Sequence, residues 1–441
     1  KKMKTHLLLI CLLTTSYHNG CHQAQEHVSN PNADSLLTSD QAALPEPFAT
    51  KSVRNFTKVI GWPEGTTPIA PKGFSVTLFA KDFINPRNIF IAPNGDVFVA
   101  EANTELSTIK KVGADVTGIS KSQRFKASAN RITLLRDTDK DGFPDFRSVY
   151  LADLNQPYGI LILNNSFYVA NTDGVWKYPY NADDTVMRAA GKLIVVLPAG
   201  GYNNHWTRNI IVNRDKSKIL IAVGSSSNAG ENGMENEIRR AAILEINPDG
   251  SGERIFANGL RNPNGIAIQP ETGVLFTAVN ERDGLGDDLV PDYFTSVQEG
   301  GFYGWPYSYF GQHQDPRMKD NPRPDLVSKA IVPDVALGSH VAALGLAFYQ
   351  GSQFPERFRD GAFIGEHGSW NRSVITGYKV VFIPFHNGKP GKPEDFLTGF
   401  IANEKTNEVH GRPVNLAVLP DGSLLLADDT SNTLWRISYN K

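Results

Sequence analysis

The sequence predicts an all-β protein, a six-bladed β-propeller with long insertions between the blades. Two observations support this fold class. A frame of two short strands joined by a turn recurs six times along the chain, and turn-forming residues are abundant, with 39 glycines and 27 prolines among 441 residues. Each copy of the frame is too small to bury both of its faces. Several copies arranged radially would share a core and leave few exposed edges.

The clearest copy of the frame spans residues 259–288. Residues 266–268 and 274–278 are expected to form two strands, because the segment 269–273 between them contains Pro and Gly and turns the chain. The other copies span residues 85–101, 155–171, 205–224, 340–367 and 410–428. Their spacing is irregular, about 50 to 80 residues against about 40 to 50 for a typical blade. Counts of five or seven blades therefore also remain open.

The first 50 residues are expected to be separate from the catalytic propeller, which we assign to residues 51–441. Lysines precede the short apolar stretch 7–13, a pattern typical of a secretory signal within residues 1–21. Cys21 stands where a bacterial lipoprotein is cleaved and acylated, and cleavage without acylation is the alternative. Residues 22–50 are polar and predict a flexible tether. We expect secretion to the periplasm or the cell surface, with a membrane tether if Cys21 is acylated.

Charge and cysteine content narrow the class of protein. The formal net charge is −2, from 44 Lys and Arg against 46 Asp and Glu, so the sequence shows no footprint for a nucleic-acid partner. The two cysteines, Cys11 and Cys21, lie in the predicted signal region, so we expect no internal disulfide in the mature fold. No Cys-x-x-Cys-His motif for haem attachment occurs.

An acidic segment between the first two copies of the frame is a candidate metal site. Asp137, Asp139, Asp141 and Asp145 surround a glycine, and alternating carboxylates of this kind can wrap a Ca²⁺ ion with oxygen ligands. Ser148 occupies the twelfth position, where an EF-hand has Glu, so the segment is not an EF-hand. The alternative is a solvated acidic turn between two strands.

The loops that enter and leave the innermost strands of a propeller meet at one face, and here they are rich in Arg and His. Four of the six histidines after residue 27 lie in such loops. The entrances carry Arg87, Gln156, His205, Arg261, Asn262, His340 and Arg412, and the exits carry Asp283, His367, Asp428 and Asp429. Histidine exchanges protons near neutral pH and guanidiniums bind carboxylates, so this face suits a polyanionic ligand with a base, or a metal. The alternatives are hydrogen-bonded loop histidines and ion pairs between blades.

Several of these segments occur together in a known family. Gly-Leu-Arg-Asn-Pro-Asn-Gly at 259–265, Asn-Glu-Arg-Asp-Gly-Leu-Gly-Asp-Asp at 280–288 and Gly-Phe-Tyr-Gly-Trp-Pro at 301–306 resemble the soluble pyrroloquinoline quinone (PQQ)-dependent sugar dehydrogenases. The resemblance covers about residues 70–441. It is closer to the L-sorbosone dehydrogenase and pyranose dehydrogenase branch than to the soluble glucose dehydrogenase. It implies a six-bladed propeller, in agreement with the repeat count.

The resemblance also implies roles for individual residues. His205 matches the family's general base, and Arg261 matches a residue that stabilises charge on the reduced quinone. The cofactor contacts that it implies are Arg87, Gln156, Arg261, Asn262, His367 and Arg412. The backbone carbonyls of Asp283 and Gly284 match those that hold the cofactor Ca²⁺. The chain departs from the glucose dehydrogenase at Asn204, where that enzyme has Asp, and at 283–284, where it has Gly-Pro.

The implied activity is oxidation of a sugar hydroxyl or aldehyde, of the aldose or sorbosone type, with PQQ and Ca²⁺ as cofactors. His205 would remove the hydroxyl proton while hydride leaves the same carbon for the quinone. An external acceptor, a cytochrome or a quinone, would reoxidise the cofactor. Two alternatives stay open: a Ca²⁺-dependent lactonase on a similar propeller, and a non-catalytic propeller that binds glycans or a protein. The trio Arg87, Arg261 and Arg412 favours the dehydrogenase, because it suits a tricarboxylate cofactor.

Overall fold

The structure is a computed structural model that describes residues 44–105 and 127–440. Its regular elements are nearly all strands, which confirms the all-β prediction, and α3 (Pro324–Val327) is the only α-helix in these two ranges. The predicted signal segment and residues 22–43 of the predicted tether lie outside the described residues. No helix of the described part combines the length and the apolar character that a membrane span requires.

Each predicted copy of the frame forms an antiparallel hairpin at one edge of a sheet. Short turns rich in Asn, Asp, Gly and Pro join the two strands, as their sequences predict. The six hairpins pair β3 (Pro86–Ile91) with β4 (Val97–Glu101), β7 (Gly159–Leu163) with β8 (Ser166–Asn171), β11 (Arg208–Val212) with β12 (Ile219–Val223), β15 (Pro263–Ile268) with β16 (Leu275–Val279), β21 (Ala343–Phe348) with β22 (Ala362–Glu366), and β29 (Pro413–Val418) with β30 (Leu424–Asp428).

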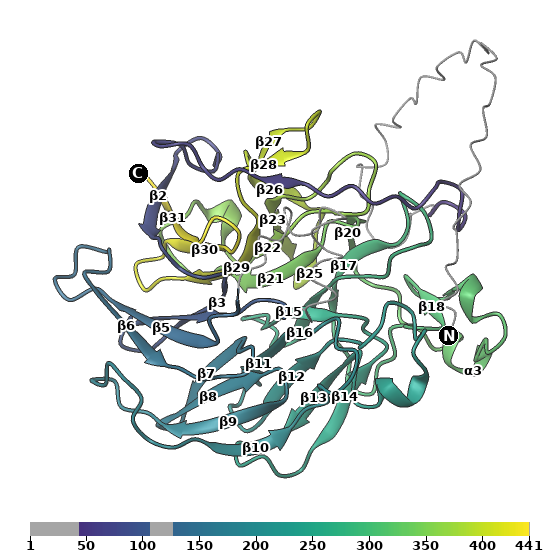
Figure 1. Ribbon diagram of the computed structural model, residues 1–441, viewed down its shortest axis with the longest axis horizontal. Coiled ribbons are helices and arrows are strands. Elements are labelled where there is room, and N and C mark those ends of the chain that lie inside the picture. Colours follow the sequence, from purple (N-terminus) through teal and green to yellow (C-terminus); the bar gives the residue numbers. More distant parts are fainter. Residues whose placement is uncertain (1–43, 106–126, 441) are drawn as a thin grey trace, which may run out of the picture. The chain divides into compact units, whose positions relative to one another are not determined.

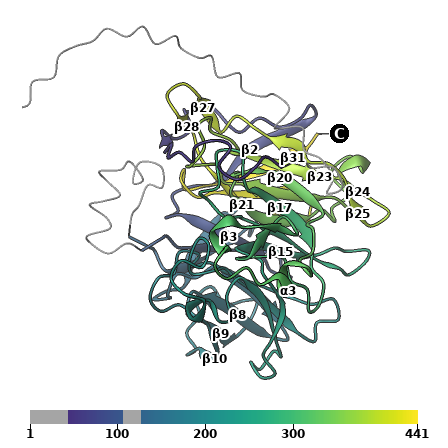
Figure 2. The same ribbon diagram turned by 90° about the vertical axis from the view of Figure 1, so that its right-hand side faces the viewer.

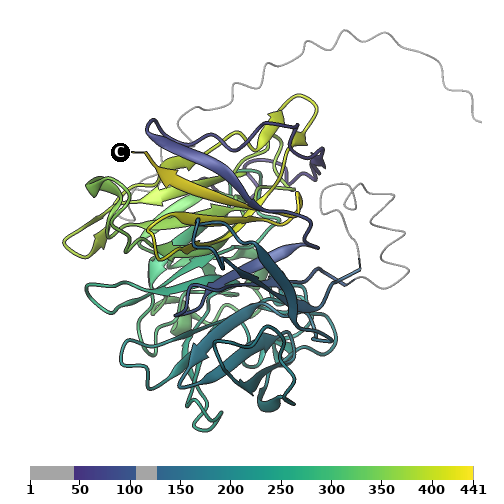
Figure 3. The same ribbon diagram turned by 90° about the vertical axis from the view of Figure 1, so that its left-hand side faces the viewer.

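Two further strands complete each hairpin, so the described residues contain six four-stranded sheets. The added pairs are β5 (Arg131–Arg136) and β6 (Phe146–Leu151), β9 (Gly174–Pro179) and β10 (Lys192–Val196), β13 (Ala242–Ile246) and β14 (Arg254–Asn258), β17 (Pro291–Ser296) and β20 (Val335–Ser339), β23 (Lys379–Ile383) and β26 (Glu394–Leu397), and β31 (Thr433–Tyr439) and β2 (Phe74–Ala80). In the last sheet, β2 from the start of the fold pairs with β31 near its end. Figure 3 shows this pairing as a purple strand beside a yellow one.

The first strands of the six hairpins form a closed ring in which each strand contacts the next. The order is β3, β7, β11, β15, β21 and β29, and β29 contacts β3 again. Their labels lie together in the central part of Figure 1. All six strands also line one central cavity of about 350 Å³. Close packing of these strands depends on glycine at some positions, because a Cβ on Gly345 of β21 would lie 2.1 Å from the carbonyl oxygen of Val414.

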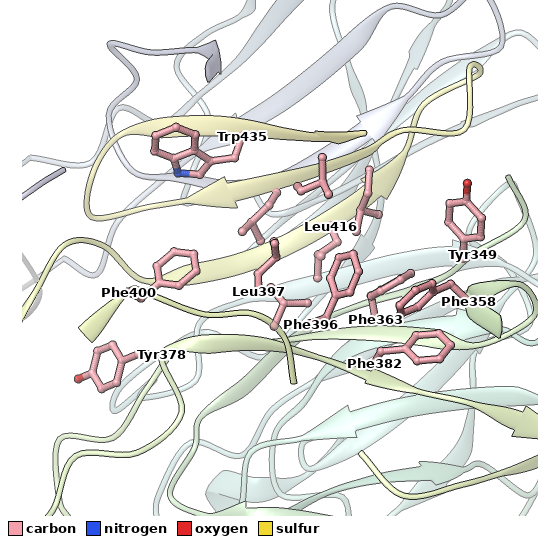
Figure 4. Close-up of a cluster of buried hydrophobic side chains, with 14 of the residues drawn as sticks. Tyr349, Phe358, Phe363, Tyr378, Phe382, Phe396, Leu397, Phe400, Leu416 and Trp435 are labelled. Carbon is pink, nitrogen blue, oxygen red and sulfur yellow. The ribbon is translucent and has the colours of Figure 1, made fainter. Parts of the chain in front are cut away.

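The core is divided into six hydrophobic clusters, each located between two neighbouring sheets. The cluster shown in Figure 4 packs Phe363 and Phe382 against Leu416 and Trp435 of the next sheet. Figure 2 shows another pair of neighbouring sheets from the side, one with β15, β17 and β20 and the other with β21 and β23. Because burying one large apolar side chain contributes about 1.5–3 kcal/mol, these interfaces hold the sheets together.

Short elements lie in the insertions between the larger strands. They are β1 (Lys58–Val59), η2 (Met234–Glu237), β18 (Ser308–Tyr309), β19 (His313–Gln314), η3 (Pro316–Met318), η4 (Glu356–Phe358), β24 (Phe385–His386), β25 (Lys389–Pro390), β27 (Ile401–Asn403) and β28 (Glu408–Val409). Residues 44–50, the described end of the predicted tether, contact the 285–287 loop. The amide of Phe48 donates to the carbonyl of Leu285 at 2.6 Å, and the hydroxyl of Thr50 accepts from the amide of Asp287 at 2.8 Å.

Candidate functional site

The predicted site residues lie where the chain enters the first strand or leaves the second strand of the hairpins, and we call this set of loops the rim. Six of them are buried, with exposed fractions of 8% or less: Arg87, Gln156, Arg261, Asn262, His367 and Arg412. His205 is half-buried, Asp283 is partly buried, and Gly284 is exposed. Burial of three guanidiniums is costly unless each has hydrogen-bond acceptors, so their partners define the chemistry of the rim.

The contacts of His205 fix its tautomer. Its Nδ1 lies 2.8 Å from the carbonyl oxygen and 3.0 Å from the hydroxyl oxygen of Ser225. The carbonyl can only accept, and the hydroxyl already donates to the carbonyl of Ser227 at 2.6 Å. Nδ1 must therefore carry the proton, and Nε2 presents a lone pair to the side-chain amide of Asn204, 3.4 Å away. An imidazole in this form can accept a proton through Nε2.

The surroundings of His205 keep it neutral. Burial, followed by the charge of Arg261, holds the pKa of His205 well below its usual value. Gly224 allows this close approach, because a Cβ there would lie 2.6 Å from the Cβ of His205 and 2.5 Å from Oδ1 of Asn262. The end of β12 therefore brings His205 and Asn262 together.

Arg261 belongs to a group of residues centred on Asn228, which we call the Asn228 cluster: Asn228, Arg261, Asp283, His340 and Asn371. Arg261 donates to the Asn228 carbonyl at 3.1 Å, to the Asn228 side-chain oxygen at 2.9 Å, and to the carbonyls of Asn280 and Glu281 at 3.1 and 2.7 Å. Its nearest carboxylate oxygen, Oδ2 of Asp283, is 3.7 Å away. Neutral acceptors therefore hold most of this guanidinium.

The carboxylate of Asp283 connects the members of the Asn228 cluster. Its Oδ1 accepts from the amide of Asn371 at 2.6 Å and lies 3.5 Å from Nδ1 of His340. Burial would raise the pKa of Asp283, but the contacts with His340 and Arg261 lower it below its usual value. Asp283 is therefore an anion at neutral pH.

On the other side of the rim, Arg87, His367, Arg412 and Asp429 form a second group, the Asp429 cluster. Oδ2 of Asp429 pairs with Arg87 at 2.9 Å, and Oδ1 contacts Nε2 of His367 at 3.0 Å. Arg412 donates to the carbonyls of His367 and Gly368 at 2.8 and 2.7 Å. Burial, followed by the charge of Arg412, lowers the pKa of His367 to about 4, so His367 is neutral and donates to Asp429.

The two clusters lie along the same rim. The guanidinium carbon of Arg87 is 5.6 Å from the ring centre of Trp206, the residue after His205. The side-chain amide of Gln156 donates to the carbonyl of Asn103 at 2.8 Å, a residue that belongs to neither cluster. The structure thus brings His205, Arg261 and Asn262 together, and separately Arg87, His367 and Arg412.

Two buried guanidiniums near His205 have no ion-pair partner among the described residues. They belong to Arg208 and Arg240 and share the side-chain oxygen of Asn203, at 3.1 and 2.8 Å. Within the described residues neither makes an ion pair, and the Nε atom of each has no hydrogen-bond partner. Burial, followed by the charge of Arg240, lowers the pKa of Arg208 to about 9. A bound anion would stabilise this part of the rim.

One of the two carbonyls predicted to hold a cofactor Ca²⁺, that of Asp283, is already occupied by side chains. The carbonyl of Asp283 accepts from the side-chain amide of Asn228 at 2.9 Å and from the Arg317 guanidinium at 2.8 Å. The same Arg317 nitrogen would lie 3.4 Å from a Cβ on Gly284. Both lone pairs of the Asp283 carbonyl are used, one of them by a cation, so a metal there would meet an occupied ligand and a like charge.

The acidic hairpin comes together only in part. Oxygen atoms of Asp137, Asp139 and Asp141 lie within 4.8 Å of one another, as a metal site would require. Asp145, predicted as a fourth ligand, instead accepts hydrogen bonds from the amide and the hydroxyl of Thr138. Calcium binding by the first three carboxylates stays a prediction.

The larger of the two described cavities, about 630 Å³, lies away from the rim. It is lined by Asn94 and Asp421, at the turns of the β3–β4 and β29–β30 hairpins, opposite the strand ends that carry Arg87 and Arg412. Its guanidiniums are matched with carboxylates, such as Arg136 with Asp96 at 2.6 Å. None of the predicted rim residues lines this cavity.

Sequence reasoning missed the role of two residues. Asn228 was not among the predicted site residues, yet its side chain contacts both Arg261 and Asp283. The buried carboxylate of Glu237 accepts from the amides and hydroxyls of Ser226 and Ser227 at 2.5 to 3.0 Å, and thereby positions the neighbouring Ser225. The run of three serines at 225–227 is a local sign of a polar loop after a strand. Nothing in the sequence indicates that Glu237 accepts hydrogen bonds from it.

Comparison with known proteins gives a family and a set of relatives. The model of the family "Domain of unknown function (DUF7133)" matches residues 69–433. An uncharacterized protein from Borreliella burgdorferi is 28% identical over 385 residues, covering 84% of this chain and 90% of that protein. A pyrroloquinoline quinone-dependent pyranose dehydrogenase from Coprinopsis cinerea is 23% identical over 368 residues, covering 68% of this chain and 48% of that protein. The chain thus spans about half the length of this second relative.

The solved structures include the same kind of protein. The holo form of the PQQ domain of pyranose dehydrogenase from Coprinopsis cinerea matches with a TM-score of 0.66 and 20% identity, covering 87% of this chain and all of that domain. At this identity the match supports the fold. Together with the sequence relative it confirms the resemblance to the soluble PQQ-dependent sugar dehydrogenases.

Proposed function

This chain belongs to the DUF7133 family, and we propose that it is a PQQ-dependent oxidoreductase that oxidises a sugar hydroxyl or aldehyde. The observation that carries the proposal is the state of His205. It is neutral, because burial and the charge of Arg261 lower its pKa, and its Nδ1–H is held by Ser225. A neutral imidazole in a fixed tautomer, with the Nε2 lone pair left to accept, can remove a proton from a substrate hydroxyl.

The donor set of the rim fits PQQ. The cofactor carries three carboxylates, and the rim buries the guanidiniums of Arg87, Arg261 and Arg412, with Arg208 and Arg240 adding positive charge that no ion pair balances among the described residues. We propose that Arg87, Gln156, Arg261, Asn262, His367 and Arg412 hold the cofactor. When bound, PQQ supplies a quinone that accepts hydride from the substrate carbon.

The chain's own residues then have distinct tasks. His205 accepts the hydroxyl proton at Nε2. Ser225 maintains the tautomer in which Nδ1 carries the hydrogen. Arg261 keeps a positive charge beside His205, because most of its acceptors are neutral and do not cancel that charge. General-base assistance of this kind contributes about 10²- to 10⁴-fold to the rate.

A lactonase is the weaker alternative. It would need oxygen ligands gathered around a cation at the rim, and in the part of the chain described here the grouped carboxylates are Asp137, Asp139 and Asp141 on an outer hairpin. The blocked carbonyl of Asp283 is also the reason that we leave the expected cofactor Ca²⁺ out of the proposal.

Reconstitution tests the proposed function. The chain lacking residues 1–21 is treated with a chelator, given PQQ with or without Ca²⁺, and assayed by dye reduction with aldoses, L-sorbosone and other aldehydes. We expect substrate-dependent reduction that requires PQQ and is lost in His205→Ala. Failure of PQQ to bind under either condition would refute the dehydrogenase and lead to assays of ester hydrolysis and glycan binding.

Three finer features belong to the same proposal. The closed order of the six inner strands and the six core clusters support a six-bladed propeller. An external cytochrome or quinone as electron acceptor and a location in the periplasm or at the cell surface stay predictions. So does a membrane tether through Cys21, which lies outside the described residues.

A further inference from the structure

Arg317 donates to one of the two carbonyls at which the resemblance implies a metal. Its Nη1 donates to the carbonyl of Asp283 at 2.8 Å, and the same nitrogen is 3.4 Å from the position of a Cβ on Gly284. These are the two residues whose carbonyls were expected to bind Ca²⁺. A guanidinium therefore brings positive charge to the point where the family pattern predicts a cation.

The surrounding residues hold Arg317 firmly. Asp315 accepts from Nε at 2.9 Å and from Nη2 at 2.7 Å, which is a bidentate ion pair. Asp315 is fully buried, and it also contacts the buried guanidinium of Arg282 at 3.2 Å. Because a bidentate pair on a buried carboxylate fixes both position and orientation, Arg317 is not a surface arginine resting by chance on a carbonyl.

Arg317 retains the capacity to bind an anion. Three of its five side-chain N–H groups are used by Asp315 and Asp283, and its side chain is 27% exposed. It reaches Arg261 through Asp283 and Asn228, because Asn228 contacts both Asp283 and Arg261. The remaining N–H groups can therefore serve a carboxylate or quinone oxygen bound near Arg261.

We propose that Arg317 replaces the calcium ion in this chain, so that PQQ is bound without a divalent cation. This inference rests on the proposed function. A Ca²⁺ ion needs about six to eight oxygen ligands at about 2.3–2.6 Å. Here the Asp283 carbonyl has two donors already, and the bound cation is a guanidinium that would repel the metal.

The test measures binding rather than turnover. PQQ affinity of the chain is determined by tryptophan fluorescence in excess chelator and again in millimolar Ca²⁺. We expect the wild-type Kd to differ by less than about twofold between the two conditions. In Arg317→Ala we expect about 10- to 100-fold weaker binding in chelator, since hydrogen bonds to charged groups are lost. Calcium should restore part of this loss, because Asp315 and the Asp283 carbonyl become available as ligands.

Two further variants control this comparison. Arg317→Lys keeps the positive charge and should remain independent of Ca²⁺. Arg323→Ala is a matched control. Arg323 is an exposed residue directly before α3, and it forms a bidentate pair with Asp325 two residues away. Its PQQ affinity should equal that of the wild type. Wild-type binding that falls at least about tenfold in chelator and returns with Ca²⁺ would overturn the proposal.

A second readout separates this proposal from the proposed function. Tb³⁺ luminescence is measured without PQQ in an Asp137→Asn, Asp139→Asn background, which removes the acidic hairpin as a binding site. Arg317→Ala should gain a Tb³⁺ signal that the Arg317 parent lacks. If PQQ binds in neither condition, the proposed function fails, and the Tb³⁺ measurement alone tests the role of Arg317. A signal gained in Arg317→Ala supports Arg317 as the occupant of the metal position. An equal signal with and without Arg317 refutes it.

Discussion

The Asn228 and Asp429 clusters bury arginines in the same rim by different means. Arg261 in the Asn228 cluster donates to main-chain carbonyls and an amide oxygen, and its nearest carboxylate is 3.7 Å away. Arg87 in the Asp429 cluster pairs with a carboxylate at 2.9 Å. Neutral acceptors satisfy N–H groups without cancelling charge, whereas a carboxylate cancels it. The charge of Arg261, which lowers the pKa of His205, is therefore less cancelled than the charge of Arg87.

The strongest test of the comparison removes the base on the Asn228 side. We expect His205→Ala to lower PQQ-dependent turnover by about 10²- to 10⁴-fold, because general-base assistance is lost. PQQ binding should change little, as Arg261 keeps its partners. Steady-state kinetics and fluorescence titration measure the two effects. The matched control is His386→Ala, an exposed histidine of β24, which should retain full turnover. Equal activity of the two variants would contradict the role of His205.

The next test compares the two arginines directly. Arg87→Met leaves the buried carboxylate of Asp429 without its ion-pair partner, which should lower the free energy of unfolding by about 3–5 kcal/mol. Arg261→Met leaves mainly neutral acceptors, and Asp283 keeps its contacts with Asn371 and His340, so we expect a cost of about 1–3 kcal/mol but a larger loss of PQQ binding. Urea unfolding and PQQ titration are measured on both. Arg87→Met with Asp429→Asn should recover stability, and a double variant as unstable as Arg87→Met would argue against the charge explanation.

Part of the pH dependence of stability should come from His367 on the Asp429 side, and His205 should add to it with the same sign, because its pKa is also lowered. His367 has its pKa lowered from 6.5 to about 4 by burial and by Arg412, so its neutral form is preferred in the folded state. The unfolded state takes up the proton first, and stability should therefore fall as the pH drops from about 6.5 towards 4. Melting temperatures across this range measure the effect. His367→Gln should flatten the slope, and an unchanged slope would assign it to other groups.

The smallest expected effect concerns carboxylates that no guanidinium pairs with. If Asp137, Asp139 and Asp141 bind Ca²⁺, a tenfold excess over Kd should stabilise the fold by about 1.4 kcal/mol. Thermal unfolding with and without Ca²⁺ measures this, and Asp137→Asn should abolish the gain. Asp145→Asn, which changes only the contact with Thr138, serves as the control. A gain that persists in Asp137→Asn would place the ion elsewhere.

Much of the fold follows from local sequence. The six hairpins form where the alternation of apolar residues and the turn residues predict them, as at Pro420-Asp421-Gly422 between β29 and β30. The outer strands were less visible, and β2 gave no sign that it completes the last sheet. Its partner β31 is at the other end of the chain, and no local pattern specifies a pairing over that distance.

The candidate site was predicted as a set of residues, but its contacts were not. The rim positions of His205, Arg261 and Arg412 follow from their places before inner strands. The sequence could not pair Arg87 with Asp429, connect Asn228 to Arg261, or bring Arg317 to the carbonyl of Asp283. The predicted metal ligation depended on a carbonyl whose lone pairs are taken by side chains from other loops.

The sequence by itself determined the strand class, the recurring hairpins and the residue types at the rim, because turn chemistry and apolar alternation act over a few neighbouring residues. Only the tertiary structure decided the partner of each buried charge and the pairing of β2 with β31. Those contacts join residues that are distant in the chain, so no local pattern specifies them. In a low-dielectric interior, the acceptor that a guanidinium contacts determines whether its charge is cancelled or kept.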